Sequence, residues 1–431
     1  MTYQEAVGRI LALRGGELAG MRQGLDRIHG LLDAIGNPER AFAIVQVGGT
    51  NGKGSIAAML AAILEAAGRR VGLYTSPHLI DFRERIRVNG RPIPESDVVD
   101  GVEAIGTLVA RLDATMFEAA TALALDHFAR EGVDVAVLEV GLGGRLDATT
   151  VGAPVVEVLG QIDFDHQAYL GSTLAAIAAE KAGIIRSGVA VAARQAPEVE
   201  ALLVRRAAEA GVPLLLEGRD LHVTVHAASL EGQRLDLAGP GWRFEDVRCR
   251  LLGVFQPGNA LLAATAARAL DAGETAIRAG LGRVQWPGRF QVLGRDPVLV
   301  LDGAHNPAGA RALAASLRAY FPGQEVTFVI GVLADKDAAG ILAALEPLAA
   351  RWVLTRSANP RAAAPEALRA IMPPGDRRIQ VAGSSREALA LAIQPPRTPI
   401  VCVAGSLSLI GEVLAQAPEK QDILCGAPGR C

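Results

Sequence analysis

The organisation of this chain is decided by residues 47–55, which read VGGTNGKGS. The apolar segment before this stretch, residues 41–47, is typical of a buried parallel strand. The Ala- and Leu-rich segment after it, residues 56–67, ends before Gly68, as a helix with a glycine just past its C-terminus does. A strand, a glycine-rich turn, a lysine and the start of a helix together predict a loop that binds phosphate groups.

The loop is a variant of the P-loop pattern G-x-x-x-x-G-K-[ST]. Val47 stands at the first glycine position, and Gly54 follows the lysine, so that the hydroxyl lies at Ser55. We expect the backbone N–H groups to point into the turn and Lys53 to reach the terminal phosphates of a nucleotide. For this stretch alone, an ordinary glycine-rich turn between a strand and a helix is the alternative interpretation.

Length and composition favour a cytoplasmic α/β protein with two or three domains. Of the 431 residues, 50% are hydrophobic and 4% are aromatic, and the formal net charge is −3. Such a composition suits close packing of helices on a sheet, and four cysteines without metal-ligand spacing fit a reducing compartment. No basic surface for nucleic acid is indicated, and no apolar run approaches the ~18 residues of a membrane span. We therefore expect neither nucleic acid nor a membrane as a partner.

Two further predicted strands end in residues suited to catalysis. The strand after the first helix runs into Ser76 and His78, and the next one, residues 134–140, carries Glu139 near its end. Because the carboxyl ends of parallel strands share the functional edge of an open sheet, Ser76 and His78 should face the same crevice as the P-loop. Glu139 stands where a Mg²⁺ ligand is expected beside bound phosphates, with a strand-end ion pair as the alternative.

A second group of charged and titratable residues follows a second glycine-rich loop, residues 141–147. The next predicted strand leads to Asp165 and His166, and the helix after it carries Glu180 and Lys181. Taken singly, His166 would be an ordinary loop histidine, and Lys181 a helix-surface charge paired with a neighbour. Together the four residues gather near one strand end.

The remaining patterns complete the predicted architecture. Residues 95–112 are predicted as a helix, whereas the charged segment 81–94 lacks helical periodicity and is predicted as a mobile loop. Alternating polar and apolar residues over 220–250 predict a small antiparallel insertion. A Trp-Pro-Gly turn at residues 286–288 predicts a hinge, and βα alternation over 291–415 predicts a smaller Rossmann-like domain.

The domain limits that we predict are 1–286 for a P-loop, parallel-sheet ATPase domain with a small antiparallel insertion, and 287–431 for the Rossmann-like domain. The last part of the second domain, after residue 415, is predicted as a frayed tail.

In their order along the chain, these motifs resemble those of folylpolyglutamate synthases and bacterial dihydrofolate synthases of the Mur ligase superfamily. The stretches that carry the resemblance are GTNGKGS (49–55), TSPHL (75–79), LEVGLGGRLDAT (138–149), DH (165–166), EKAGI (180–184), WPGR (286–289) and DGAHNP (302–307). The resemblance spans residues from about 20 to 412. One departure is Thr150, where many relatives have asparagine.

The resemblance implies roles for particular residues. The implied ATP contacts are Gly49, Thr50, Asn51, Gly52, Lys53, Gly54, Ser55, Asn259, Arg289 and Asp302. The implied magnesium ligands are Ser76 and Glu139 for one Mg²⁺ and His166 for a second. The implied catalytic residues are Lys53, Lys181, His166 and His305, with Lys181 as a carbamylated lysine. The implied substrate contacts are Thr115, Met116 and Phe117 at a pterin pocket, with Arg145 and Asp147.

The resemblance also implies a reaction in folate biosynthesis and one-carbon metabolism. An ATP-dependent acid–amino-acid ligase of this kind joins L-glutamate to dihydropteroate, or to the glutamyl tail of a reduced folate, through an acyl phosphate. Because an exposed acyl phosphate hydrolyses, the second domain is expected to close over it at the hinge. We expect a monomer that acts on small-molecule substrates.

Two other functions are possible alternatives for a chain with a P-loop of this kind. A Mur-type cell-wall peptide ligase would carry a separate UDP-binding domain, for which the region before the P-loop is too short. A non-catalytic nucleotide-binding relic should have lost some of the chemical residues, yet Lys53, Glu139, His166 and Lys181 are all present. A ligase of the folate type is therefore the function that the sequence predicts.

Overall fold

The computed structural model describes residues 1–16, 22, 24–294, 296–395 and 397–416. The chain divides into two compact units. Unit 1 comprises residues 1–224, 235–248 and 258–284, and unit 2 comprises residues 225–234, 249–257 and those from 285 onward. The predicted frayed tail lies almost wholly outside the described residues. The domain limits 1–286 and 287–431 stay a prediction.

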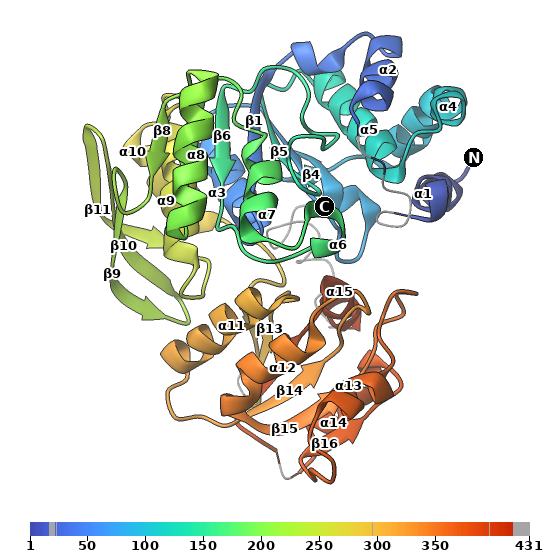
Figure 1. The fold of residues 1–431 in the computed structure, drawn as a ribbon, viewed down its shortest axis with the longest axis vertical. Helices are drawn as coiled ribbons and strands as arrows, with labels where there is room; N and C mark the ends of the chain where they lie inside the picture. Colours follow the sequence, from blue (N-terminus) through green and yellow to red (C-terminus); the bar gives the residue numbers. More distant parts are fainter. Residues whose placement is uncertain (17–21, 23, 295, 396, 417–431) are drawn as a thin grey trace. The chain divides into compact units, whose positions relative to one another are not determined.

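Unit 1 is built on an eight-stranded sheet with the strand order β4-β3-β2-β5-β1-β6-β7-β8 (Figure 1). The six strands from β2 to β8 run parallel, whereas β3 and β4 are added antiparallel at one edge. The strands are β1 (Ala43–Gly48), β2 (Val71–Tyr74), β3 (Ile86–Val88), β4 (Arg91–Pro92), β5 (Val135–Glu139), β6 (Val156–Leu159), β7 (Val189–Ala192) and β8 (Leu214–Leu216). The β1 strand, which leads into the P-loop, thus lies inside the sheet between β5 and β6.

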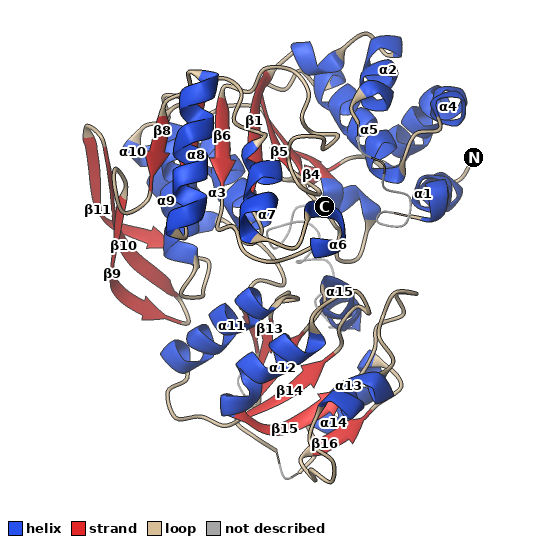
Figure 2. Ribbon diagram, in the orientation of Figure 1, coloured by secondary structure: helices blue, strands red, loops and turns tan. Residues whose placement is uncertain are grey.

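Helices cover both faces of this sheet, as the crossovers of a parallel sheet require (Figure 2). They are α1 (Tyr3–Ala12), α2 (Asp26–Ala34), α3 (Lys53–Ala66), α4 (Glu95–Leu112), α5 (Met116–Arg130), α6 (Gln167–Leu170), α7 (Leu174–Ala182), α8 (Pro197–Ala210), α9 (Gln256–Arg268) and α10 (Glu274–Arg283). The α10 helix packs so closely on α3 that a Cβ at Gly280 would come within 2.5 Å of the Ile63 backbone. The predicted helix over residues 95–112 is confirmed.

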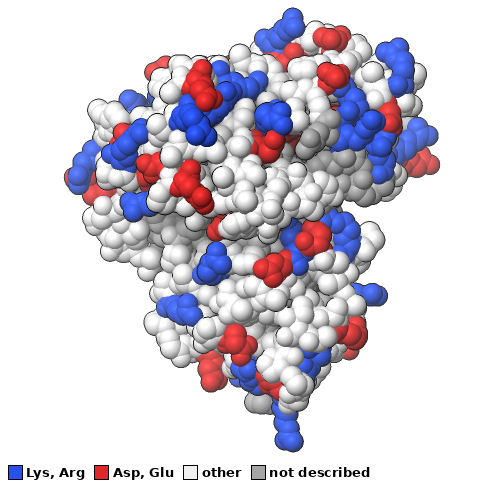
Figure 3. Space-filling model, in the orientation of Figure 1, with Lys and Arg blue, Asp and Glu red and all other residues white. Residues whose placement is uncertain are grey.

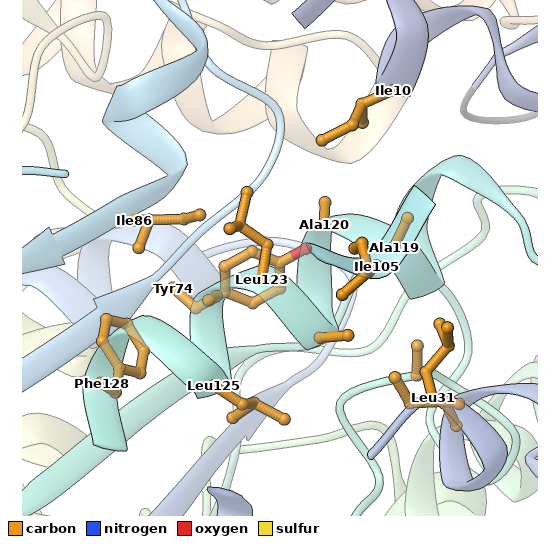
Figure 4. Close-up of a cluster of buried hydrophobic side chains, with 14 of the residues drawn as sticks. Ile10, Leu31, Tyr74, Ile86, Ile105, Ala119, Ala120, Leu123, Leu125 and Phe128 are labelled. Carbon is orange, nitrogen blue, oxygen red and sulfur yellow. The ribbon is translucent and has the colours of Figure 1, made fainter. Parts of the chain in front are cut away.

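One side of unit 1 holds an apolar core between the sheet and its helices. Figure 4 shows Ile10 of α1, Leu31 of α2, Leu123 and Phe128 of α5, and Tyr74 of β2 in this cluster. All five side chains are at most 3% exposed. Burial of such side chains supplies most of the driving force that holds these helices on the sheet.

The prediction of a mobile loop over residues 81–94 is wrong. This segment holds a short 3₁₀ helix (Phe82–Arg85) and the strands β3 and β4. Asp81 caps the 3₁₀ helix, and the Glu84 carboxylate accepts hydrogen bonds from the backbone N–H groups of Leu79, Ile80 and Asp81. Strands of two or three residues are too short to show a periodicity, so the pairing of β3 with β2 and of β4 with β3 could not be read from the pattern.

One helix boundary differs from its predicted position, because α3 begins at Lys53 rather than after Ser55. The α9 helix begins at Gln256, so that Asn259 lies in its first turn. Proline is tolerated in the first turn of a helix because the N–H group that it lacks would have no partner there, and Pro257 is the second residue of α9.

A three-stranded sheet with the order β11-β10-β9 corresponds to the predicted insertion over residues 220–250. Its strands are β9 (His222–Ser229), β10 (Gly232–Gly239) and β11 (Trp242–Cys249). Consecutive strands are separated by two residues, which is the connection of antiparallel hairpins.

Unit 2 contains a six-stranded sheet with the order β12-β13-β17-β14-β15-β16. All its pairings are parallel except that of β12 with β13, as expected for a Rossmann-like arrangement. The strands are β12 (Gln291–Leu293), β13 (Val298–Leu301), β14 (Val326–Ile330), β15 (Ala349–Leu354), β16 (Ile379–Val381) and β17 (Ile400–Ala404). The helices are α11 (Pro307–Tyr320), α12 (Ala338–Leu345), α13 (Pro365–Ile371), α14 (Ser385–Ala392) and α15 (Leu407–Gln416).

Positive and negative side chains are interspersed over the face of the molecule drawn in Figure 3, in keeping with the net charge of −3. Within the described part of the chain, no helix combines the length and the apolar character needed to cross a membrane.

The core of unit 2 offers a test of the fold. Trp352 on β15 is fully buried, its ring lies 5.2 Å from that of Phe328, and its Nε1 donates a hydrogen bond to Glu346 at 3.2 Å. Trp352→Ala should lower the free energy of unfolding by about 3–5 kcal/mol, because it leaves a cavity. Trp242→Ala is the control, since Trp242 is only partly buried on β11. Urea unfolding measures both, and equal losses would contradict the burial of Trp352.

Candidate active site

The P-loop joins β1 to α3 in a conformation that glycine permits. Gly49 and Gly52 have φ angles of 123° and 88°, which side chains with a Cβ rarely adopt. A Cβ at Gly49 would lie 3.0 Å from the backbone of Gly160, and one at Gly52 would lie 2.6 Å from Oδ1 of Asn259. The loop is therefore tightly enclosed, and the predicted nucleotide contact Asn259 lies against it.

Two lysines converge on one carbonyl group of this loop. Lys53 Nζ donates hydrogen bonds to the carbonyl oxygens of Gly49 at 3.3 Å and Thr50 at 3.1 Å. Lys181 Nζ, from the last turn of α7, donates to the same Gly49 oxygen at 2.9 Å. Lys181 is only 4% exposed, so it is not the solvated surface charge that its helix position alone would suggest. The structure thus brings together two residues that are 128 positions apart in the sequence.

Glu139 lies beside the P-loop strand. Its Cα is the register partner of Val47 in the parallel pairing of β1 with β5, and its side chain is 5% exposed. Oε2 of Glu139 accepts a hydrogen bond from the backbone N–H of Ser76 at 3.1 Å. Two of the residues predicted to bind Mg²⁺ are therefore neighbours at the carboxyl edge of the sheet.

Glu139 and Ser76 offer oxygen atoms that suit a Mg²⁺ ion bound together with a nucleotide. Mg²⁺ prefers oxygen ligands, and in nucleotide sites it is held by one or two protein side chains together with phosphates and water. The described residues contain no group of three or more His, Cys, Asp or Glu side chains that could hold a metal by themselves. A single buried carboxylate beside a phosphate loop suits a cation that is shared with the nucleotide.

His166 belongs to a segment that is attached to the P-loop. The Thr50 hydroxyl donates to the carbonyl oxygen of Asp163 at 3.0 Å and accepts from its N–H at 3.1 Å. His166 has a φ of 52°, and it immediately precedes the short helix α6. Its backbone N–H donates to Asp165 at 2.8 Å, and its Nε2 lies 3.8 Å from the same carboxylate. Because Asp163 is bonded to Thr50 of the P-loop, His166, three residues later, belongs to a segment that is anchored at this loop.

Asp147 organises the second glycine-rich loop. Its carboxylate accepts hydrogen bonds from the N–H groups of Leu142 and Thr149 and from the Thr149 hydroxyl. Burial raises the pKa of the Asp147 carboxyl above its usual range. Arg145 forms a half-exposed ion pair with Glu180 at 2.8 Å. Both residues hold the loop in shape, and their substrate contact stays a prediction.

The residues predicted to line a pterin pocket lie at the start of α5. Thr115 caps this helix and shares a capping box with Glu118, and Met116 is buried in the core. Phe117 is the partly exposed member of the three, with its ring 5.8 Å from that of Tyr74. A Cβ at Gly141 would come within 2.5 Å of this ring, so the second glycine-rich loop passes directly over it.

An ion pair that the sequence patterns did not reveal supports this helix start. Arg27 of α2 contacts Glu118 through Nε at 3.1 Å and through Nη2 at 2.9 Å, and the two side chains are 15% and 5% exposed. The charges lie 91 positions apart, and no local spacing marks such a pair. Only the arrangement of α2 against α5 makes it visible.

In unit 2, the predicted residues Asp302 and His305 follow β13, and Arg289, which precedes β12, lies near them. The Asp302 carboxylate accepts hydrogen bonds from the N–H groups of Phe290 at 2.7 Å and Ala304 at 2.8 Å. Burial raises the pKa of Asp302, while the nearby Arg289 opposes this shift. His305 Nδ1 lies 2.8 Å from the Gly303 carbonyl oxygen. Asp302 and His305 lie immediately before α11, which is capped by Asn306. We call Asp302, His305 and the nearby Arg289 the Asp302 cluster.

Two known protein families match this chain, one over most of unit 1 and one over most of unit 2. Residues 47–267 match the family described as Mur ligase middle domain, and residues 288–407 match the family described as Mur ligase, glutamate ligase domain. The P-loop and the lysine pair fall within the first match, and the Asp302 cluster falls within the second.

Curated relatives match over most of their length. A dihydrofolate synthase/folylpolyglutamate synthase of Mycobacterium tuberculosis is 39% identical over 85% of this chain and 82% of its own. A folylpolyglutamate synthase of Lacticaseibacillus casei is 38% identical over 90% of this chain and 92% of its own. The bifunctional enzyme of Escherichia coli is 36% identical over 91% of this chain and 90% of its own.

Solved structures share the fold. Folylpolyglutamate synthase of Mycobacterium tuberculosis, complexed with ADP and AMPPCP, superposes with a TM-score of 0.88 at 37% identity and covers 96% of this chain and 98% of its own. The Escherichia coli protein in complex with DHPP and ADP gives a TM-score of 0.87 at 32% identity and covers 96% of this chain and 97% of its own. This chain therefore belongs to the folylpolyglutamate synthase/dihydrofolate synthase family of Mur ligases, which are ATP-dependent ligases.

Proposed function

We propose that this protein joins L-glutamate to dihydropteroate, to the glutamyl tail of a reduced folate, or to both, with hydrolysis of ATP to ADP and phosphate. The observation that carries the proposal is the convergence of Lys53 and Lys181 on the Gly49 carbonyl, beside the buried Glu139. The names of the relatives, and the solved complexes with AMPPCP and folate or with DHPP and ADP, support the substrate classes.

The reaction follows from the electrophile that the ligase needs. A carboxylate is a poor electrophile, so its oxygen first attacks the γ-phosphorus of ATP, and ADP leaves. The amine of glutamate then attacks the acyl carbon of the acyl phosphate, phosphate leaves, and the amine loses a proton. Phosphoryl transfer of this kind depends mainly on positioning and on electrostatic stabilisation of the transferring group.

The residues of unit 1 supply that positioning. The P-loop from Gly49 to Ser55 is proposed to hold the phosphates through backbone N–H groups and the start of α3. The Lys53 ammonium lies at the loop itself, where it offsets negative charge on the transferring phosphoryl group. Asn259, which touches Gly52 from α9, is proposed to contact the nucleotide.

Glu139 and Ser76 are proposed to hold one Mg²⁺, and His166 a second. The cation supplies charge neutralisation and orientation of the phosphate oxygens. The contact between the Ser76 N–H and Glu139 aims the carboxylate, and the anchoring of Asp163 to Thr50 holds the segment that leads to His166.

Lys181 is proposed to act as a carbamate. A neutral lysine amine captures CO₂, and the product carries a negative charge and two oxygen ligands suited to a hard cation. Burial supports this proposal, because a second ammonium next to Lys53 costs free energy when it is removed from water. Arg289, Asp302 and His305 of unit 2 are proposed to serve the nucleotide and the incoming amino acid. We further propose that the protein is a monomer with domain limits near residue 286.

The proposal is tested by ADP release from the purified protein with Mg²⁺, ATP and glutamate. One arm contains dihydropteroate, another contains tetrahydrofolate, and a third lacks the pterin substrate. Release of ADP together with a glutamylated product, seen by mass spectrometry, supports the proposal and shows which of the two activities is present. Absence of an amide product in both pterin arms would contradict it.

The P-loop lysine gives the first prediction. Lys53→Ala should fold normally, because Lys53 is the first residue of α3 and its side chain is only partly buried. Its kcat should fall by about 10²-fold or more, because charge stabilisation of the transferring phosphoryl group is lost. Lys336→Ala in unit 2 removes a lysine outside the P-loop and is the control for overall charge. Normal turnover by a folded Lys53→Ala protein would place the phosphate site elsewhere.

Lys181 gives a prediction that separates a carbamate from an ordinary ammonium. Lys181→Ala should lose nearly all activity, and short carboxylic acids should restore part of it by replacing the missing carboxylate. Carbon-13 NMR of protein equilibrated with labelled bicarbonate should show a carbamate signal that is absent from Lys181→Ala. An active Lys181→Ala protein, or a wild-type protein without this signal, contradicts the carbamate.

Arg289 gives a prediction for unit 2. Arg289→Ala should raise the KM for ATP more than the KM for the folate substrate, because the guanidinium is proposed to contact the nucleotide. Arg318→Ala, on the exposed face of α11, is the matched control. Initial rates at varied ATP and varied folate measure both constants. A change confined to the folate KM would show that Arg289 serves the other substrate.

A further inference from the structure

A buried chain of hydrogen bonds links the P-loop strand to the second glycine-rich loop. It begins at Gln46 on β1, whose side chain is fully buried. Gln46 Nε2 donates to the Thr149 hydroxyl at 3.1 Å and to the Thr150 hydroxyl at 2.7 Å. Its Oε1 accepts from Arg186 Nη2 at 3.3 Å. Both donor hydrogens of the amide and its oxygen are therefore used.

Each hydrogen of the Gln46 amide and of the Thr149 and Thr150 hydroxyls has one possible direction in this series of hydrogen bonds. Because each threonine hydroxyl accepts from Gln46, its single hydrogen is directed onward. Thr149 donates to the Asp147 carboxylate at 2.5 Å, and Thr150 donates to the Gly144 carbonyl oxygen at 2.6 Å. Buried hydrogen bonds that use the Gln46 amide and both threonine hydroxyls in this way favour one arrangement of the groups that they join.

The loop held in this way is packed against the backbone of Lys181. A Cβ at Gly144 would lie 2.8 Å from the carbonyl oxygens of both Glu180 and Lys181, so the loop and α7 are in close contact. The N–H of Arg145 donates to the Glu180 carbonyl oxygen at 2.9 Å. The Gly144–Arg145 backbone is thus in direct contact with the last turn of α7.

The contacts that begin at Gln46 lead through Gly144 and Lys181 back to the P-loop. Lys181 Nζ reaches the Gly49 carbonyl, three residues after Gln46 on the same strand and loop. The P-loop has separate attachments of its own, from the Thr50 N–H to Gln161 at 2.8 Å and from the Thr50 hydroxyl to Asp163. The P-loop therefore has attachments that do not pass through Gln46, whereas the hydrogen bonds from Gln46 through Thr150 lead to Gly144, which contacts the backbone of Lys181.

We infer that Gln46, acting with Thr150, is a positioning residue for Lys181. The inference rests on the proposed function of Lys181 in the ligase reaction. According to this inference, loss of the hydrogen bond between Gln46 and Thr150 lowers kcat without weakening nucleotide binding. Positioning partners behind a reacting group typically contribute about 10- to 100-fold to activity.

Three variants of Gln46 and Thr150 are compared in the full-length protein. Gln46→Met removes both donors and the oxygen that accepts from Arg186, at similar volume; Thr150→Val removes the hydroxyl, and Thr150→Ser keeps it. Thr265→Val is the matched control, because Thr265 is equally buried in unit 1 and its hydroxyl donates only along α9, to Leu261 at 2.8 Å. We expect kcat to fall about 10- to 100-fold in Gln46→Met and Thr150→Val, with the KM for ATP unchanged. Thr150→Ser and Thr265→Val should retain wild-type kcat.

Hydrogen exchange supplies a readout that does not depend on activity. The N–H groups of Leu142 and Thr149, both bonded to Asp147, should exchange about tenfold faster in Gln46→Met and Thr150→Val, because each variant loses hydrogen bonds that hold this loop. The same amides should be unaffected in Thr150→Ser and Thr265→Val. If Gln46→Met does not fold, the Thr150 pair carries the test alone.

The inference is overturned by wild-type kcat in Thr150→Val, by an equal loss in Thr150→Ser, or by a rise in the ATP KM that accounts for the whole loss. Each of these outcomes leaves the ligase assignment standing as long as the wild-type protein forms the amide product. If the wild-type protein forms none, the proposed function fails instead, and hydrogen exchange still decides whether Gln46 and Thr150 hold the loop.

Discussion

The carbonyl group of Gly49 is the contact on which the arrangement of unit 1 depends. It accepts hydrogen bonds from two lysines that arrive from different helices, one from the first residue of α3 and one from the last turn of α7. A carbonyl can point in this direction only because Gly49 adopts a φ of 123°, and because a neighbouring backbone, that of Gly160, occupies the space of a Cβ. Glycine at this position is thus required twice, by the backbone angle and by the close approach.

The parallel sheet makes this convergence feasible. β1 lies between β5 and β6, so the loops that follow these three strands emerge at the same edge. Glu139 ends one neighbouring strand, and the segment with Asp163 and His166 follows the other. Polar groups buried at such an edge must be satisfied by one another, as the Gln46 amide, the hydroxyls of Thr149 and Thr150 and the Asp147 carboxylate are in this network.

Some of the residues that the family resemblance predicts to contact the substrate also have structural roles. The Asp147 carboxylate accepts hydrogen bonds from three donors of its own loop, and the Thr115 hydroxyl accepts one from the N–H of Glu118 in the first turn of α5. Such residues can be indispensable to a site without touching what it binds, because the loop that they hold carries the groups that do. The Arg27–Glu118 ion pair plays the same supporting part beneath the start of α5.

The sequence by itself determined the P-loop, the long helices and the order of the motifs, because these features are local: a glycine-rich turn, a helical period and a strand-end carboxylate are each visible within about ten residues. The family was predictable for the same reason, since its motifs are short and contiguous. Only the tertiary structure decided the pairing of residues 81–94 into strands, the burial of Lys181 against Gly49, and the hydrogen bonds from Gln46 to Thr149 and Thr150. Each of these joins positions that are distant in sequence or strands too short to show a period, so its energy lies in contacts formed by the packed sheet and not in any local pattern.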